Sequence, residues 1–98
     1  AALNAYTKSV ASEVAPHGVR VLAISPGNVT SPGADKLRQD LAKGLSLDPA
    51  ALTSGVPLGR VGVPSDIAEM VGFLVSERAA WITGSNFLID GGEAPFVF

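Results

Sequence analysis

Two short apolar segments constrain the fold of this chain more than any other feature. Residues 19–24 are rich in β-branched and apolar side chains and are bounded by turn residues, a pattern typical of a buried strand in a parallel sheet. Residues 86–90 form a second apolar run, which the glycine pair at 91–92 ends. Two parallel strands need a crossover between them, and that crossover is right-handed. The chain is therefore expected to contain a strand–helix–strand unit.

A first helix is expected over residues 1–15. No capping residue precedes its pattern, so we expect this helix to begin in residues before Ala1. Lys8 lies only two positions after Tyr6, and residues at that spacing point to different sides of a helix. The pair is therefore not expected to act together, and Tyr6 is expected to pack along an apolar stripe. That stripe consists of Leu3, Tyr6, Val10 and Val14.

Two further helices are expected between the strands. Residues 34–45 carry leucines at every fourth position, and residues 66–76 carry a second apolar stripe. Ser65 is the expected N-cap of the later helix, and Asp66 favours the positive end of its dipole. The order helix, strand, excursion, helix, strand indicates an α/β fold.

Composition excludes several classes of function. The chain has 98 residues, with 7 Lys and Arg against 9 Asp and Glu, and a formal net charge of -2. Neither nucleic acid nor an anionic membrane is therefore the expected partner. Because the sequence has no cysteine and one histidine, no disulfide framework and no metal site are expected. We expect a cytoplasmic protein without a membrane-spanning segment.

Three longer segments carry a family resemblance. They are Ser-Pro-Gly-Asn-Val-Thr-Ser-Pro at residues 25–32, Pro-Leu-Gly-Arg-Val-Gly-Val-Pro-Ser-Asp-Ile-Ala at 57–68, and Ile-Thr-Gly-Ser-Asn-Phe-Leu-Ile-Asp-Gly-Gly at 82–92. In this order and spacing, together with Ala-Ala-Leu at 1–3, they resemble the C-terminal portion of the short-chain dehydrogenases/reductases. The resemblance covers essentially the whole chain.

This resemblance implies a Rossmann-type, doubly wound parallel sheet. Residues 1–98 would form a partial NAD(P)-binding domain, namely its last two strands and their helices. The implied activity is hydride transfer between NAD or NADP and the alcohol or carbonyl carbon of a small molecule. The family's Gly-rich loop and catalytic serine match no position here, and its catalytic Tyr and Lys would lie just before Ala1. No catalytic residue is therefore assigned, and the 98 residues alone are expected to be inactive.

Four residues are candidates for binding the cofactor. In the family, a Pro-Gly-x-Val/Ile-x-Thr segment lies against the nicotinamide end of the cofactor. Pro26, Gly27 and Val29 match this segment, and Ser31 stands at the threonine position. Gly27 would let the backbone approach the ligand, and Pro26 would set the turn. The alternative interpretation is an ordinary turn after a strand.

Residues 32–60 correspond to the family's variable substrate lid. Long loops of this kind are usually functional or disordered. Leu37, Leu41 and Leu45 either line an apolar substrate pocket or hold the lid on the core. Arg60, at the end of the lid, is expected to be a structural hydrogen-bond donor.

The expected partners are the N-terminal half of the fold, or a subunit that supplies it, and further copies in a homo-oligomer. The apolar stripe of the first helix and the apolar tail at 94–98 also support a second hypothesis. In that hypothesis the chain is a non-catalytic assembly or interaction module derived from the same fold.

Overall fold

The computed structural model describes residues 1–48, 51 and 55–95. Helices and strands follow one another in the expected order, which confirms the α/β class. No helix in these ranges is long and apolar enough to cross a membrane. The elements are α1 (Ala2–Val14), the 3-10 helix η1 (Ala15–His17), β1 (Ala23–Pro26), α2 (Pro32–Gly44), α3 (Pro64–Leu74), the 3-10 helix η3 (Glu77–Ala79) and β2 (Asn86–Ile89).

The two strands lie side by side and run parallel, as the sequence predicts. Ala23 stands opposite Asn86, and Pro26 stands opposite Ile89. The helix α3 precedes β2 and forms the crossover between the strands. A proline is tolerated at position 26 because the N–H groups that donate to β2 belong to alternate residues such as Ala23 and Gly27, so the nitrogen of Pro26 is not a donor of this ladder.

The first strand begins later than the expected range of 19–24. Val21 already lies beside the segment that leads into β2, but its N–H donates to the side-chain hydroxyl of Thr83 at 2.9 Å. That hydroxyl stands where a regular ladder would present a backbone carbonyl. Backbone pairing with the second strand is regular only from Ala23, whose N–H donates to the Ser85 carbonyl at 3.0 Å.

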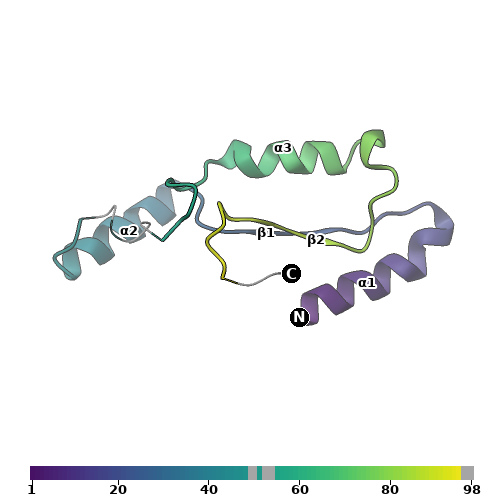
Figure 1. Cartoon of the computed structure of the whole chain (residues 1–98), viewed down its shortest axis with the longest axis horizontal. Helices are drawn as coiled ribbons and strands as arrows, with labels where there is room; N and C mark the ends of the chain where they lie inside the picture. Colours follow the sequence, from purple (N-terminus) through teal and green to yellow (C-terminus); the bar gives the residue numbers. More distant parts are fainter. Residues whose placement is uncertain (49–50, 52–54, 96–98) are drawn as a thin grey trace.

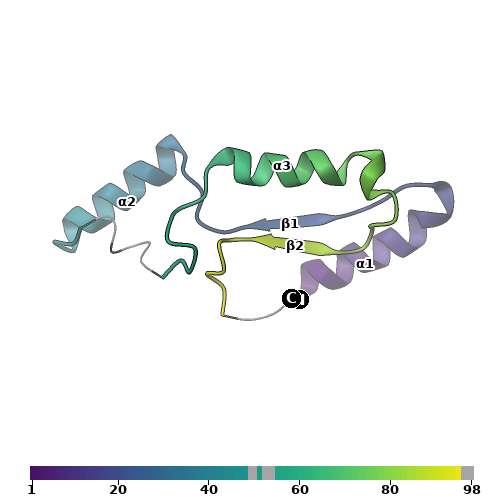
Figure 2. The ribbon, with the colours of Figure 1, turned by 45° about the horizontal axis from the view of Figure 1, so that its top comes forward.

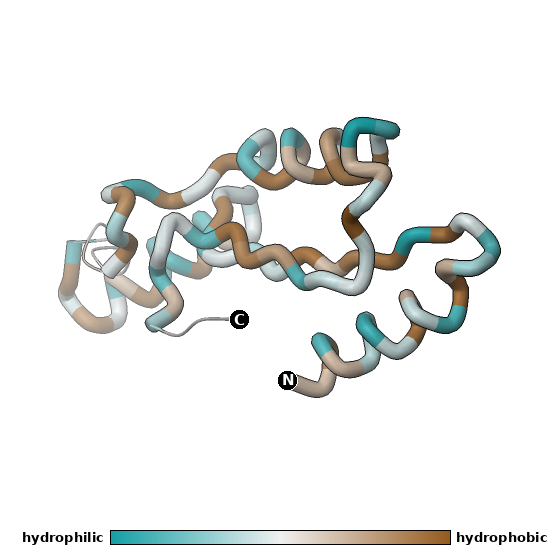
Figure 3. Tube along the Cα trace, turned by 45° about the vertical axis from the view of Figure 1, so that its right-hand side comes forward, coloured by the Kyte–Doolittle hydropathy of each residue, from teal (hydrophilic) through white to brown (hydrophobic). Residues whose placement is uncertain are grey.

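The helices lie on both sides of the sheet. Figures 1 and 2 show α3 along one side of the strands and α1 on the other, the layering of a doubly wound fold. In both views α2 extends beyond the carboxyl ends of β1 and β2. Figure 3 shows hydrophobic segments along the strands and on the side of α3 that faces them.

Polar side chains tie the layers together. Ser25 Oγ donates to Asn86 Oδ1 at 2.9 Å, and Asn86 Nδ2 donates to Asn4 Oδ1 at 2.8 Å, which joins both strands to α1. On the other side of the sheet, the Arg20 guanidinium donates to the Leu74 carbonyl at 2.7 Å. A cation at this position satisfies a free carbonyl and complements the negative end of the α3 dipole.

The buried core of the described residues is small. The accessible surface is 6823 Å², whereas a compact monomer of 10.0 kDa exposes roughly 5,200 Å². The radius of gyration is 16.7 Å, against about 13 Å for a compact domain of this length. Much apolar surface is therefore left uncovered. The buried apolar residues are Ala11, Ala42, Val56, Leu74 and Ala79.

Tyr6 does not pack along the apolar face of α1, which corrects the sequence prediction. Its side chain is 70% exposed, because α1 turns Thr7 and Ala11 toward the core instead. These two smaller residues let the helix approach the sheet closely. Leu3, on the same stripe, is half exposed.

The helix α3 begins two residues earlier than expected, at Pro64 rather than Asp66, and Ser65 is not its N-cap. Val63 occupies the capping position and Pro64 follows at the first helical position. The polar partner is Asp66, whose Oδ2 accepts a hydrogen bond from the Val63 N–H at 2.7 Å. The carboxylate thus satisfies a backbone donor at the helix start.

Candidate functional site

A cavity lies where the two strands end. Its volume is about 160 Å³. Parallel strands place the loops that follow them at the same edge of the sheet, and ligands of open α/β sheets bind at that edge. Three segments that are distant in sequence therefore meet here. The lining residues are Asn28, Val29, Leu58, Arg60, Gly62, Asp66, Ile89, Asp90 and Gly91.

Gly27 brings the loop after β1 against the end of β2. Its N–H donates to the Ile89 carbonyl at 2.9 Å. A Cβ at this position would lie 2.5 Å from Cβ and 2.8 Å from Cα of Asp90. The space that a side chain would need is thus taken by β2 itself. The glycine is required because the loop after β1 and the end of β2 approach each other closely. The sequence indicates only that a glycine here leaves room for a ligand.

The segment 28–30 forms a backbone bridge with Gly62, the residue before the N-cap of α3. The Gly62 N–H donates to the Asn28 carbonyl at 2.8 Å, and the Thr30 N–H donates to the Gly62 carbonyl at 2.8 Å. In a parallel bridge of this kind, the N–H and C=O of the central residue point away from the partner. The central residue is Val29.

Val29 consequently presents a free backbone edge. Within residues 1–48, 51 and 55–95, neither its N–H nor its C=O takes part in a hydrogen bond. Backbone groups left in this state are obligatory hydrogen-bonding groups that need water or a ligand. One donor and one acceptor on the same residue, at the wall of a cavity, form a suitable partner for a planar carboxamide.

Ser31 begins the helix α2. Its Oγ accepts a hydrogen bond from the Ala34 N–H at 3.1 Å, and its backbone is extended, as an N-cap requires. Pro32 follows at the first helical position. One acceptor of the hydroxyl is therefore used within the chain, while its proton remains able to donate. A role toward a cofactor stays a prediction for this residue.

The motif Asp90-Gly91-Gly92 closes the cavity beyond β2. The Asp90 carboxylate accepts hydrogen bonds from the Gly92 N–H at 2.9 Å and the Ala94 N–H at 2.7 Å. Both glycines adopt positive φ, +64° and +87°, which favours glycine. The Gly91 carbonyl accepts from the Leu58 N–H at 3.1 Å, so this turn holds the end of the 32–60 segment against the sheet.

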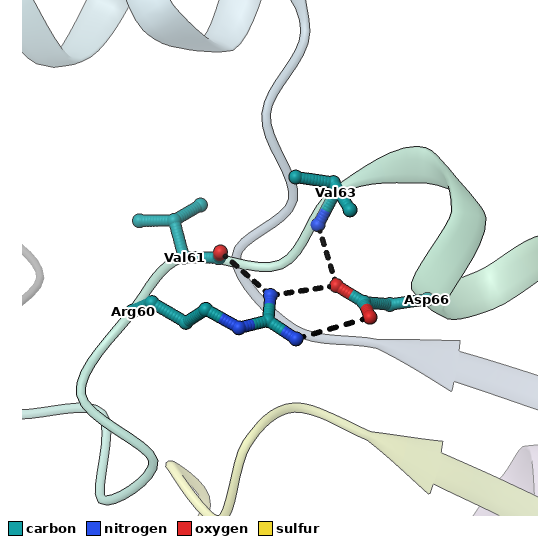
Figure 4. Close-up of polar contacts among 4 residues, drawn as sticks. All are labelled: Arg60, Val61, Val63 and Asp66. Atoms are coloured by element: carbon teal, nitrogen blue, oxygen red, sulfur yellow. Dashed lines mark hydrogen bonds and ion pairs between the residues drawn. The ribbon is translucent and has the colours of Figure 1, made fainter.

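Arg60 and Asp66 form an ion pair at the edge of the cavity (Figure 4). The two guanidinium nitrogens donate to the two carboxylate oxygens at 2.8 and 3.1 Å. These bonds, with the further bond from the Val63 N–H, lower the pKa of Asp66 from 3.8 to about 2. The same carboxylate raises the pKa of Arg60. Arg60 is thus a hydrogen-bond donor within the chain, as expected.

The leucines of the expected lid do not reach the cavity. Leu37, Leu41 and Leu45 lie on α2 and are 67%, 50% and 57% exposed. Their helix extends away from the sheet (Figure 2), and none of them is among the residues that line the cavity. Residues 49–50 and 52–54 of the expected lid lie outside the described residues.

Sequence reasoning missed one polar contact at the site. Asn28 Nδ2 donates to Glu93 Oε2 at 2.8 Å and to Oε1 at 3.2 Å. The two residues are 65 positions apart, so no local pattern could have paired them. Among the described residues, no three His, Cys, Asp or Glu side chains come together in a way that could hold a metal ion.

Comparisons with known proteins agree with this architecture. The family model described as Enoyl-(Acyl carrier protein) reductase matches residues 1–93. An uncharacterized short-chain type dehydrogenase/reductase of Sinorhizobium fredii is 42% identical over 92 residues, which are 94% of this chain and 16% of that protein. The 3-oxoacyl-[acyl-carrier-protein] reductase of Rickettsia felis is 38% identical over 92 residues, 94% of this chain and 35% of that protein.

Solved structures of high similarity share the fold. The L-sorbose reductase of Gluconobacter frateurii, solved with NADPH and L-sorbose, superposes with a TM-score of 0.83 at 31% identity, covering 98% of this chain and 38% of that one. A short chain dehydrogenase family protein of Francisella tularensis has a TM-score of 0.83 at 32% identity, covering 94% of this chain and 40% of that one.

The chain therefore spans between about a sixth and two fifths of the length of these relatives. The match extends over nearly all of its own residues, through the strands, the cavity and the glycine turn. Together these findings show that the chain belongs to the short-chain dehydrogenase/reductase family.

Proposed function

We propose that this chain is the C-terminal part of an NAD(P)-dependent oxidoreductase that transfers hydride between a nicotinamide and an alcohol or carbonyl carbon. In this proposal residues 1–98 are a partial NAD(P)-binding domain, and residues 32–60 are a substrate lid. The chain supplies the loop on the nicotinamide side, the lid and surfaces for oligomer formation. The solved relatives that contain NADPH or NADH support the choice of cofactor class.

The observation that carries the proposal is the free backbone edge of Val29. It lies at the carboxyl end of β1, on the wall of a cavity, in a segment that matches the family's nicotinamide-side motif. A primary carboxamide offers one acceptor and a pair of donors, so it can bond to the N–H and C=O of one residue at once. Such bonds would orient the nicotinamide ring.

The residues of this chain would bind and orient the cofactor. When bound, the nicotinamide supplies or accepts the hydride. Pro26 and Gly27 fix the end of β1 against β2, Val29 offers its backbone edge, and Ser31 can donate its hydroxyl proton. The exposed leucines of α2 would offer apolar surface to a substrate. The proton-transfer groups expected for this family are not assigned to any residue here, so the 98 residues alone are expected to be inactive.

Titration with NADH and NADPH tests the proposal, using the protein expressed from its complete natural reading frame. Val29→Pro removes the free N–H and leaves both hydrogen bonds to Gly62, because those use Asn28 and Thr30. We expect dissociation constants three- to tenfold higher than in the wild type, the effect of one lost hydrogen bond. Val29→Ala is the matched control and should bind as the wild type does. Equal binding by both variants, with the fold intact, would contradict the assignment of Val29.

A second function is supported by the exposed apolar side chains. Trp81 is fully exposed, and Val75 and Tyr6 are 74% and 70% exposed. Apolar surface of this kind is typical of protein–protein interfaces. In this alternative the chain is a non-catalytic assembly module. Stable oligomers in sedimentation velocity, with no binding of either nicotinamide cofactor, would favour it. That the protein is cytoplasmic and forms homo-oligomers stays a prediction.

A further inference from the structure

The function proposed above assigns no role to the contact between Asn28 and Glu93. It joins the loop after β1 to the turn after β2, and it lies next to the cavity that Asn28 lines. Both side chains are half-buried. A charge-assisted hydrogen bond of this kind is about twice as strong as one between neutral groups.

Glu93 is held in place before it meets Asn28. The Asp90 carboxylate accepts from the N–H groups of Gly92 and Ala94, the residues on either side of Glu93. The Glu93 N–H itself donates to the Asp90 carbonyl at 3.3 Å. The turn therefore fixes the backbone from which the Glu93 side chain extends.

The orientation of the Asn28 amide follows from the charge of its partner. An ionised carboxylate only accepts hydrogen bonds, so the amide must turn its Nδ2 donor toward Glu93. The backbone of Asn28 is held independently, because its carbonyl accepts from the Gly62 N–H. Residues 28–30 are thus supported from two sides, by Gly62 through the backbone and by Glu93 through a side chain.

We propose that Glu93 is a positioning residue, which acts through Asn28 to hold residues 28–30 in the geometry that binds the nicotinamide end of the cofactor. This inference rests on the function proposed above. Loss of the contact leaves the loop held by backbone bonds, from Gly27 to Ile89 and in the Gly62 bridge, and lets the edge of Val29 move relative to the cavity. Binding then has to order the loop, which weakens affinity.

Three variants of the protein, expressed from its complete natural reading frame, test the inference. Asn28→Asp places two carboxylates against each other, and the dissociation constant for NADH or NADPH should rise about tenfold. Glu93→Gln keeps an acceptor oxygen and should change binding by no more than about threefold. The double variant reverses the polarity of the bond, because the new Gln donates to the new Asp, and it should recover binding to within about threefold of the wild type.

Two controls separate this role from general loss of structure. Glu69→Gln makes the same chemical change on the exposed side of α3 and should leave binding unchanged. Hydrogen exchange of the Thr30 and Gly62 amides, which form the bridge, should be faster in Asn28→Asp in the ligand-free protein and slow again in the double variant. Melting temperatures of all variants show whether each one folds.

The outcomes are distinct. If Asn28→Asp binds like the wild type, or if the double variant is no better than Asn28→Asp, the inference is overturned. If the wild type binds neither cofactor, the proposed function fails, while the exchange measurement still decides whether Glu93 holds the loop. Rescue of both binding and exchange in the double variant supports the inference.

Discussion

Replacing Gly27 with alanine is expected to push the end of β1 away from the end of β2. The added methyl group would lie 2.5 Å from Cβ and 2.8 Å from Cα of Asp90. Carbon atoms that are not bonded rest about 3.5–4.0 Å apart, so the end of β1 and the end of β2 must separate by about 1 Å. Over-packing costs about 1–3 kcal/mol, and atoms of or next to the backbone cannot rotate away. We expect a loss of about 3 kcal/mol in the free energy of unfolding.

Urea denaturation of the protein expressed from its complete natural reading frame measures this loss. Gly33→Ala is the matched control, because an added Cβ there meets nothing within 4 Å. Alanine in the first turn of α2 should leave the free energy of unfolding unchanged or raise it by up to about 1 kcal/mol. The slope of the free energy against urea concentration should be the same for all three proteins.

Two results would refute the reasoning about Gly27. A loss below about 1 kcal/mol for Gly27→Ala would mean that the two strand ends do not meet as closely as the structure places them. An equal loss for Gly33→Ala would mean that alanine is costly for reasons unrelated to the contact with Asp90.

Two further predictions concern the starts of α3 and α2. The ion pair with Arg60 holds the pKa of Asp66 at about 2, so this carboxylate stabilises the fold above about pH 4, and the effect is lost as pH falls toward 2. Asp66→Asn should therefore have a lower urea midpoint than the wild type at pH 5, and the difference should shrink as pH falls toward 2; equal midpoints at pH 5 would contradict this. Ser31→Ala should lower the free energy of unfolding by about 1 kcal/mol, through the lost N-cap, while Ser31→Thr should retain it. Equal urea curves for the two Ser31 variants would argue against the cap.

The order of elements could be predicted because it depends on local patterns. Apolar runs and helical periodicity lie within one stretch of chain, and both strands and all three helices were found where these patterns stand. The start of β1 could not be predicted, because it depends on the hydroxyl of Thr83, which replaces a backbone partner. Tyr6 was misplaced because a helical stripe shows which residues share a face, but not which part of the face meets the sheet.

The position in the fold of the candidate cofactor residues could be predicted from the sequence, but the reason for the glycine among them could not; their role toward a cofactor stays a prediction. Pro26 ends β1, and Gly27 and Val29 follow it at the carboxyl edge of the sheet. The reason for the glycine, however, is the approach of Asp90, which depends on the register of two strands 60 residues apart in sequence. The same holds for the contact between Asn28 and Glu93. The pairing register of two strands that are distant in sequence cannot be predicted from the residue pattern of either strand alone.

The two parts of the proposed binding region differ in how they are held. Residues 28–30 are supported by Gly62, which precedes α3, and by Glu93, which follows β2. One support thus comes from the crossover, and the other comes from the turn after the second strand. A loop held in this way needs little ordering when a ligand binds, which favours affinity for the part of the ligand that it contacts. Within residues 1–48, 51 and 55–95, no long-range backbone hydrogen bond holds α2 in a comparable way, and its leucines lie exposed. Under the proposed function, the loop would suit a ligand group of constant shape such as the nicotinamide carboxamide, whereas α2 would suit substrates of differing shape.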